Sequence, residues 1–250
     1  MRRPSIAELR AATQPASIFE RDSGEHWAGR LYIRRLSPYL TRLLLRTPIT
    51  PNGVTWLMIG VGLTAAALLS VPGVVTAVAA VLLIQLQIML DCSDGELARW
   101  RGQSSVAGVY LDRIGHWVTE AALPIALGVR ADEATLGLIV AVLVLLVKGE
   151  SALVTVARAE TGRPAAADTR AVAAPRASGL RRARRALGFV PFFRAFVAME
   201  FTLLALAAAI VDAAAGDEAG SRALVVALVA VAAVTAAGHL LAILTSDRLK

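Results

Sequence analysis

Two short acidic stretches decide the fold of this chain: Asp-Cys-Ser-Asp-Gly-Glu-Leu-Ala-Arg at residues 91–99 and Gly-Val-Tyr-Leu-Asp-Arg-Ile-Gly-His at residues 108–116. They lie where two apolar segments meet, at about residues 74–90 and 105–129. A helix of roughly 20 apolar residues crosses the hydrocarbon core of a bilayer. We therefore expect the carboxylates at the edge of a membrane, with the rest of the chain holding them there.

The composition indicates an all-α integral membrane protein. Of 250 residues, 56% are hydrophobic and 18% are charged, whereas a soluble domain carries roughly 25% charged residues. The net charge of +7 comes from basic residues beside apolar segments. It therefore indicates orientation in a membrane and contact with anionic lipids, and no nucleic-acid partner. The single cysteine, Cys92, excludes an internal disulfide.

Apolar segments of spanning length predict six transmembrane helices, at about residues 54–71, 74–90, 105–129, 134–157, 190–211 and 223–244. A polar link at residues 96–104 is expected between the second and third. Ahead of the first, residues 28–46 carry leucines and arginines at helical spacing, which is typical of an amphipathic interfacial helix. Pro38 is expected near its start or at a kink. Residues 1–27 are polar and unpatterned, so we predict a flexible segment before a membrane domain at residues 28–250.

The distribution of lysine and arginine predicts the orientation. The N-terminal region, the link with Arg99 and Arg101, the arginine run at residues 181–185 and the C-terminus fall on one side. The other side holds short loops at residues 72–73, 130–133 and 212–220. The basic side is cytoplasmic by the positive-inside rule, which places both termini and the acidic stretches there. No internal repeat is visible, which counts against an inverted-repeat transporter.

The acidic stretches have the spacing of two helix faces. Asp91 and Asp94 share a face by i,i+3 spacing, and Asp112 shares one with His116 by i,i+4 spacing. If the helices pack together, the carboxylates converge, and a divalent cation relieves their repulsion. Oxygen ligands suit Mg²⁺ or Mn²⁺ bound together with a substrate phosphate. Small residues nearby allow close approach of a ligand: Gly95, Ala98 and Gly108.

These residues resemble the signature of the CDP-alcohol phosphotransferases, Asp-x2-Asp-Gly-x2-Ala-Arg-x8-Gly-x3-Asp-x3-Asp. Every position from Asp91 to Asp112 matches. The connector before the first span, with Asn52 and Thr55, is similar as well, so the resemblance covers about residues 28–245. It implies a membrane enzyme of phospholipid biosynthesis, with a CDP-linked lipid such as CDP-diacylglycerol as donor and an alcohol or phosphorylated alcohol as acceptor. CMP is the product, and homodimers are common in the family.

The resemblance also implies roles for individual residues. Asp91, Asp94 and Asp112 would hold Mg²⁺ or Mn²⁺ against the diphosphate of the donor. The cytidine-phosphate site would be lined by Asn52, Thr55, Gly95, Ala98, Arg99 and Gly108.

The chain departs from the signature at its last position, where His116 replaces the aspartate proposed as the general base. A neutral imidazole can take a hydroxyl proton near pH 7, and Glu120, one turn further on, can hold its tautomer. Alternatively, His116 alters metal binding. A third interpretation is a catalytically impaired relative that binds lipid or nucleotide, or regulates a partner. A transporter with Lys148, Glu150 and Glu200 on its path is a further rival.

Three basic residues predict an acceptor site. Lys148 and Arg194 fall in the cytoplasmic halves of their predicted spans, and Arg158 falls at the cytoplasmic end of the fourth. Together they form a candidate pocket for an anionic acceptor or a lipid phosphate. The alternative is that Lys148 pairs with Glu150 or Glu200 and only stabilises the helix bundle.

Overall fold

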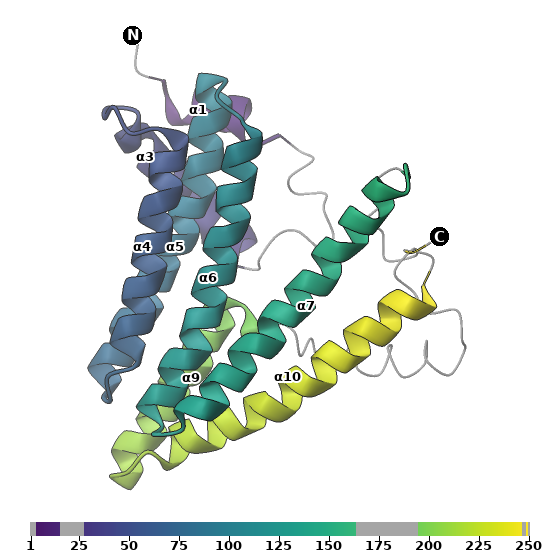
Figure 1. Ribbon diagram of the computed structural model, residues 1–250. Helices are drawn as coiled ribbons and strands as arrows, with labels where there is room; N and C mark the ends of the chain where they lie inside the picture. Colours follow the sequence, from purple (N-terminus) through teal and green to yellow (C-terminus); the bar gives the residue numbers. More distant parts are fainter. Residues whose placement is uncertain (1–3, 16–27, 164–194, 247–248, 250) are drawn as a thin grey trace. The chain divides into compact units, whose positions relative to one another are not determined.

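The computed structural model describes residues 4–15, 28–163, 195–246 and 249, and all of their regular structure is helical (Figure 1). The chain divides into two compact units. Unit 1 comprises Met1–Ala65 with Ala79–Thr119, and unit 2 comprises Ala66–Val78 with Glu120–Lys250. Each unit is described by itself.

The helices follow one another along the chain as α1 (Ile6–Thr13), the π-helical turn η1 (Gly29–Ile33), α3 (Arg34–Leu44), α4 (Pro51–Leu69), α5 (Val74–Arg101), α6 (Val106–Arg130), α7 (Ala134–Glu160), α9 (Ala198–Ala215) and α10 (Ala219–Thr245).

The long helices confirm an all-α integral membrane protein. Among the described residues, five helices are long and apolar enough to cross a membrane: α4, α5, α7, α9 and α10. The third predicted span corresponds to α6, which is of spanning length but carries Asp112, Arg113 and Glu120. Its charged side chains are what set it apart from the other five, and two of them belong to the predicted site.

The predicted link at residues 96–104 is wrong for most of its length. Helix α5 continues through the whole acidic stretch to Arg101, because no proline interrupts it. It ends at Gly102, whose φ of +64° is the left-handed conformation of a helix C-cap. The N–H of Gln103 then donates to the carbonyl of Ala98. The fifth predicted span also differs: α9 begins at Ala198, and residues 190–194 lie outside the described part of the chain.

In unit 1, α4 packs against the helices that carry the acidic stretches. Val54, Met58 and Ile59 of α4 form a buried cluster with Leu90 and Leu97 of α5. Helix α6 approaches the same face of α4 at Gly115. A Cβ atom there would lie 2.6 Å from Cε of Met58 and 2.8 Å from Cγ1 of Ile59. The glycine therefore lets α6 approach closely enough to bring its polar residues beside those of α5.

The predicted interfacial helix corresponds to η1 and α3, and part of its apolar surface faces outward, whereas Leu40 and Leu44 pack against the buried cluster of α4 and α5. Leu36, Tyr39 and Leu43 are 45%, 58% and 56% exposed. The buried residues of α3 include two with hydroxyl groups, Ser37 and Thr41. Apolar side chains on the outer face of a membrane protein suit the lipid boundary.

Helix α1 was not predicted from the sequence, which indicated a flexible segment there. Its first turn has a capping box: the Ser5 hydroxyl accepts from the Glu8 N–H at 3.1 Å, and the Ser5 N–H donates to the Glu8 carboxylate at 2.6 Å. The helix packs against α3 and buries Leu9 completely. Residues 16–27 lie outside the described part.

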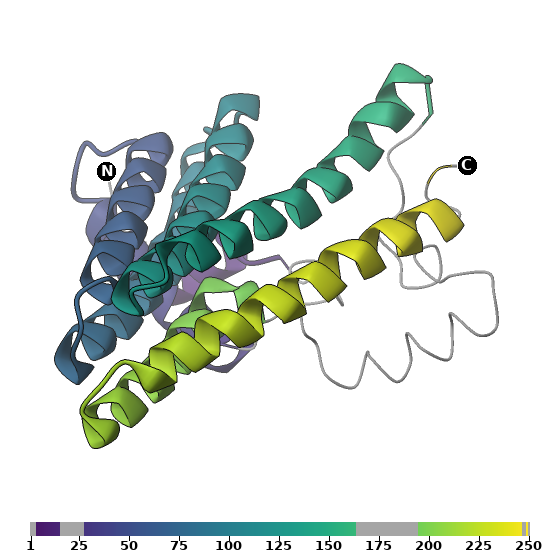
Figure 2. The ribbon, with the colours of Figure 1, turned by 60° about the horizontal axis from the view of Figure 1, so that its bottom comes forward.

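In unit 2, α10 packs against both α7 and α9 (Figures 1 and 2). A buried arginine, Arg130 at the end of α6, ties this unit together. Its guanidinium donates to the carbonyls of Val71 and Gly73 at 3.0 and 3.2 Å, and to the Ser221 hydroxyl at 3.1 Å. Its Nε atom lies 3.7 Å from the Asp212 carboxylate, which accepts both the N–H and the hydroxyl of Ser221. Arg130 therefore joins four segments through one buried charge.

Candidate functional site

The acidic stretches meet at three side chains, all in unit 1. Asp91 comes from α5, and Asp112 and His116 come from successive turns of α6. Nε2 of His116 lies 2.9 Å from Oδ1 of Asp91 and 3.5 Å from Oδ1 of Asp112. Each residue offers one ligand atom, and these three atoms lie within 4.8 Å of one another. The helix spacing seen in the sequence therefore becomes one cluster of two carboxylates and an imidazole.

The cluster is partly accessible and incompletely bonded. The side chains of Asp91, Asp112 and His116 are 27%, 40% and 38% exposed, so a ligand can reach them. Oδ1 of Asp112 is buried and has no hydrogen-bond partner in the described part of the chain. A buried carboxylate oxygen of this kind is costly unless a donor or a cation satisfies it. Its position inside the cluster suits a cation.

Asp94 lies one turn after Asp91 on α5 and is bonded differently. Its side chain is buried, and its Oδ2 accepts a hydrogen bond of 2.6 Å from the Thr55 hydroxyl of α4. Asp94 is not one of the three residues within 4.8 Å of one another. The sequence assigned Thr55 to the donor site and Asp94 to the metal, and the structure places the two side chains in direct contact.

The other predicted donor residues lie around the same helix ends. The Arg99 side chain folds back over Gly95, where a Cβ atom would lie 3.1 Å from one terminal guanidinium nitrogen. Between α4 and α6, a Cβ atom on Gly108 would lie 3.1 Å from Oδ1 of Asn52. Ala98 is half-buried on α5. Two of the predicted small residues, Gly95 and Gly108, thus stand directly against polar side chains.

Glu120 has a different partner from the one predicted. Its carboxylate lies 2.8 Å from Nζ of Lys148. The carboxylates described beside His116 are those of Asp91 and Asp112. Glu150 and Glu200 were the alternative partners considered for Lys148, and the ion pair described for Lys148 is the one with Glu120.

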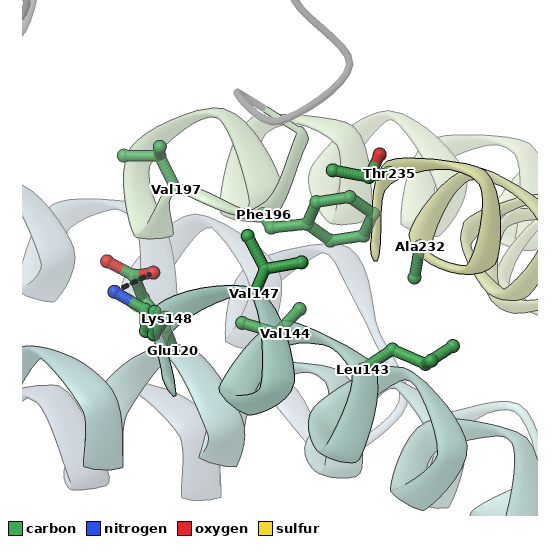
Figure 3. A pocket seen from close by; sticks show the side chains of 9 residues that line it. All are labelled: Glu120, Leu143, Val144, Val147, Lys148, Phe196, Val197, Ala232 and Thr235. Atoms are coloured by element: carbon green, nitrogen blue, oxygen red, sulfur yellow. Dashed lines mark ion pairs between the residues drawn. The ribbon is translucent and has the colours of Figure 1, made fainter. Parts of the chain in front are cut away.

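The Lys148–Glu120 pair lies on the wall of a cavity of about 200 Å³ in unit 2 (Figure 3). The rest of its lining is mostly apolar and comes from α7, α10 and the residues around the start of α9: Leu143, Val144, Val147, Phe196, Val197, Ala232 and Thr235. Arg158 follows Lys148 by ten residues, about 15 Å along α7, and is not part of the lining. Arg194 lies outside the described residues. Of the two predicted acceptor residues that the structure describes, Lys148 lines this cavity and Arg158 does not.

Glu96 was not among the predicted site residues, because the sequence pattern placed it in a polar link. The structure buries Glu96 completely within the signature stretch. Its carboxylate accepts hydrogen bonds from Ser37 at 2.5 Å, Thr41 at 2.7 Å and Gln14 at 2.8 Å. Ser37 and Thr41 lie one helical turn apart, which is the only signal that the sequence offers for their shared partner.

A family model described as CDP-alcohol phosphatidyltransferase matches residues 48–245. The chain belongs to the CDP-alcohol phosphatidyltransferase family. It is thus a membrane transferase, and the matched region contains the whole cluster around His116. Residues 1–47, with α1, η1 and α3, lie outside this family match. A search of curated proteins finds no match.

Proposed function

We propose that this transferase moves a substituted phosphate, the phosphatidyl group, from a CDP-alcohol such as CDP-diacylglycerol to the hydroxyl of an alcohol. The convergence of Asp91, Asp112 and His116 in a family member carries the proposal, because it assembles ligands for a cation beside a group that can take a proton. The acceptor oxygen bonds to the phosphorus of the phosphatidyl group. The bond from that phosphorus to the bridging oxygen breaks, and its electron pair leaves with CMP.

The residues present fit a divalent metal ion. Ligands at adjacent corners of an octahedral ion lie about 3 Å apart when the bonds are about 2.1 Å, and His116 Nε2 lies 2.9 and 3.5 Å from its two carboxylate neighbours. We propose that Asp91, Asp112 and Asp94 hold Mg²⁺ or Mn²⁺, with His116 facing the same centre. When bound, the ion supplies positive charge that stabilises the donor diphosphate and the leaving phosphate.

His116 is the proposed base. As a neutral ring it donates its Nε2–H to the Asp91 carboxylate and takes the proton of the acceptor hydroxyl at Nδ1, and the imidazolium that forms faces the carboxylates of Asp91 and Asp112. Two carboxylates within 3.5 Å stabilise that positive charge, as an orienting aspartate does in other histidine-based sites. The alternative role, direct ligation of the metal, would use Nε2, the atom that faces the two carboxylates, and is distinguished by the variants described in the Discussion.

We propose binding contacts for the donor and for the acceptor from the residues around Arg99 and around the cavity at Lys148. Arg99 provides a cation for the cytidine phosphate, held directly over the backbone of Gly95. Lys148 is the proposed acceptor contact, because it is a cation at the wall of a cavity. The basic loops support a cytoplasmic location of this chemistry, with donor entering from the bilayer. A homodimer remains a prediction.

The deciding experiment measures CMP release by the purified protein in lipid nanodiscs. CDP-diacylglycerol is supplied with Mg²⁺ or Mn²⁺ and a panel of alcohols, namely glycerol phosphate, serine and inositol phosphate, and lipid products are identified by mass. We expect release with one acceptor and its loss on addition of EDTA. Asp91→Asn and Asp112→Asn abolish release, whereas Glu160→Gln, at an exposed position on α7, preserves it.

The impaired-relative hypothesis predicts a different result in the same experiment. No acceptor and no CDP-alcohol donor would then yield CMP, although the protein would still bind nucleotide or lipid. That outcome would overturn the proposed activity. This hypothesis arises because His116 stands where the family signature has an aspartate.

A further inference from the structure

Helix α1 packs against α3, where Pro38 leaves a backbone carbonyl of α3 without its helical hydrogen bond. Pro38 has no N–H to donate to the carbonyl of Arg34, four residues earlier. The side chain of Gln14 supplies the missing donor, at 2.9 Å. Arg10 similarly donates to the carbonyl of Arg35 at 2.8 Å. Gln14 therefore satisfies the one carbonyl that the proline leaves open, and Arg10 adds a bond to the next carbonyl.

Gln14 also donates to Glu96, which belongs to the signature stretch on α5. A completely buried carboxylate needs several donors, and its three come from Gln14 together with Ser37 and Thr41 of α3. Hydrogen bonds to an ionised carboxylate are shorter and stronger than bonds between neutral groups. Gln14 thus contacts α3 and α5 at once, through one side-chain nitrogen.

Arg99 completes the connection. Its Nε atom donates to the carbonyl of Thr13, the last residue of α1, at 2.6 Å. Its terminal nitrogens lie 3.1 and 3.3 Å from the position that a Cβ atom would take on Gly95. One edge of the guanidinium is therefore held by α1, and the terminal nitrogens lie over the glycine.

We propose that residues 6–14, which lie outside the family match, are a positioning element that fixes the Arg99 guanidinium over Gly95 to receive a phosphate of a cytidine nucleotide. The inference rests on the proposed function, because it takes the donor to be a CDP-alcohol. An unrestrained arginine loses rotamer freedom when it binds a phosphate, whereas a side chain already held by Thr13 has lost most of it. Preorganisation of this kind raises affinity without adding a contact to the ligand.

The test uses the full-length protein in detergent, with CMP as the probe in isothermal titration calorimetry. Leu9→Asp places a charge at the buried face of α1 and undocks it, so we expect CMP affinity to fall roughly ten-fold. Ala11→Asp adds the same charge at an exposed position of the same helix and is expected to bind CMP like the wild type. Should Leu9→Asp fail to fold, Gln14→Ala replaces it, with a smaller loss in the same direction.

A double variant separates positioning from a general loss of structure. Arg99→Lys keeps the charge but not the Nε donor, and weakens CMP binding by itself. If α1 acts through Arg99, Leu9→Asp in that background lowers affinity little further. Undiminished CMP binding by Leu9→Asp and Gln14→Ala, or effects that add to that of Arg99→Lys, would overturn the positioning role alone. A wild-type protein that binds no CMP would overturn the proposed function and this inference with it.

Discussion

At the scale of single residues, His116 decides the chemistry of the site. The family signature expects a carboxylate there, and the imidazole instead lies 2.9 Å from Asp91 and 3.5 Å from Asp112. A third carboxylate at the same place would repel both neighbours unless a cation were bound. A histidine can accept a proton there or ligate a metal ion, and its substitution distinguishes the two roles.

Replacement of His116 tests its role as a base. His116→Ala is expected to lower the rate of CMP release by about 10²- to 10⁴-fold, because the hydroxyl proton loses its acceptor. His116→Asp restores the family residue and is expected to retain substantial activity. Both are measured at saturating Mg²⁺ and Mn²⁺, so that a loss of metal affinity shows as a changed metal dependence. Near-full activity of the alanine variant would rule out a basic role.

Thr55 is expected to contribute to stability through Asp94. Thr55→Val removes the hydroxyl that donates to the buried Oδ2 of Asp94. An unsatisfied buried carboxylate oxygen costs about 1–3 kcal/mol. Thr64→Val is the matched control, because Thr64 is exposed on the same helix and bonds only the carbonyl of Gly60 among the contacts described. Thermal unfolding in detergent should therefore show a larger decrease for Thr55→Val, and equal decreases would contradict this account.

At the scale of elements, close helix packing depends on particular glycines. Gly128 of α6 and Gly137 of α7 face each other across the turn that joins these helices. A Cβ atom on Gly137 would lie 2.5 Å from the carbonyl oxygen of Pro124, and one on Gly128 would lie 2.8 Å from the Cα of Gly137. Backbone atoms cannot move aside as a flexible side chain can. Small residues at such crossings are typical of helix pairs in membranes.

Gly137→Ala is therefore expected to destabilise the α6–α7 pair by about 1–3 kcal/mol, the usual cost of overpacking. Gly149→Ala provides the control on the same helix, since a Cβ atom there meets nothing within 4 Å. Alanine also favours the helix over glycine, so Gly149→Ala should leave stability unchanged or raise it. Unfolding of both variants in the same detergent measures the difference, and equal stability would show that the crossing can relax.

At the scale of the whole molecule, unit 2 is held together by Arg130. The residue is 3% exposed and contacts the 71–73 turn, the end of α9 and the start of α10. A buried charge has this effect because each of its donors requires a partner that water cannot supply. The sequence placed Arg130 in a short charged loop, where an exposed side chain was the natural expectation.

Arg130→Ala should cost about 3–5 kcal/mol, because it leaves Asp212 buried without its cation. Arg222→Ala is the matched control: Arg222 is half exposed and lies 3.7 Å from Glu133, and such pairs contribute about 0–1 kcal/mol. Chemical denaturation in detergent compares the two variants. A small effect for Arg130→Ala would mean that the four segments hold together without it.

The proposed orientation is tested by labelling in intact cells. Cys92 is buried and is the only cysteine of the chain, so an introduced cysteine reports its own side. Asp217→Cys, in the loop between α9 and α10, should react with a membrane-impermeant maleimide from outside. Gln103→Cys, after α5, should react only when the membrane is opened. The opposite pattern would place the site on the outer face.

Much of the architecture and the composition of the site follow from local sequence. Apolar segments of spanning length can be recognised along the chain without knowledge of any tertiary contact. The spacing of the signature alone made Asp91, Asp94 and Asp112 candidates for the site. The end of a helix is harder to predict, because the many polar residues at positions 91–101 are compatible with both a link and a helix. Helix α1 was not predicted, because eight residues form a stable helix only when tertiary contacts support them.

What local sequence determined was the set of helices and the chemical type of the site, since periodicity and spacing act along one chain segment. Only the tertiary structure decided the partners of its charged groups. It placed His116 between two aspartates, paired Glu120 with Lys148, and buried Glu96 beneath hydroxyls 55 and 59 residues away in the chain. The physical reason is that a buried charge must be satisfied by whichever donors the packing of separate helices brings within about 3 Å, and sequence spacing carries no record of that packing.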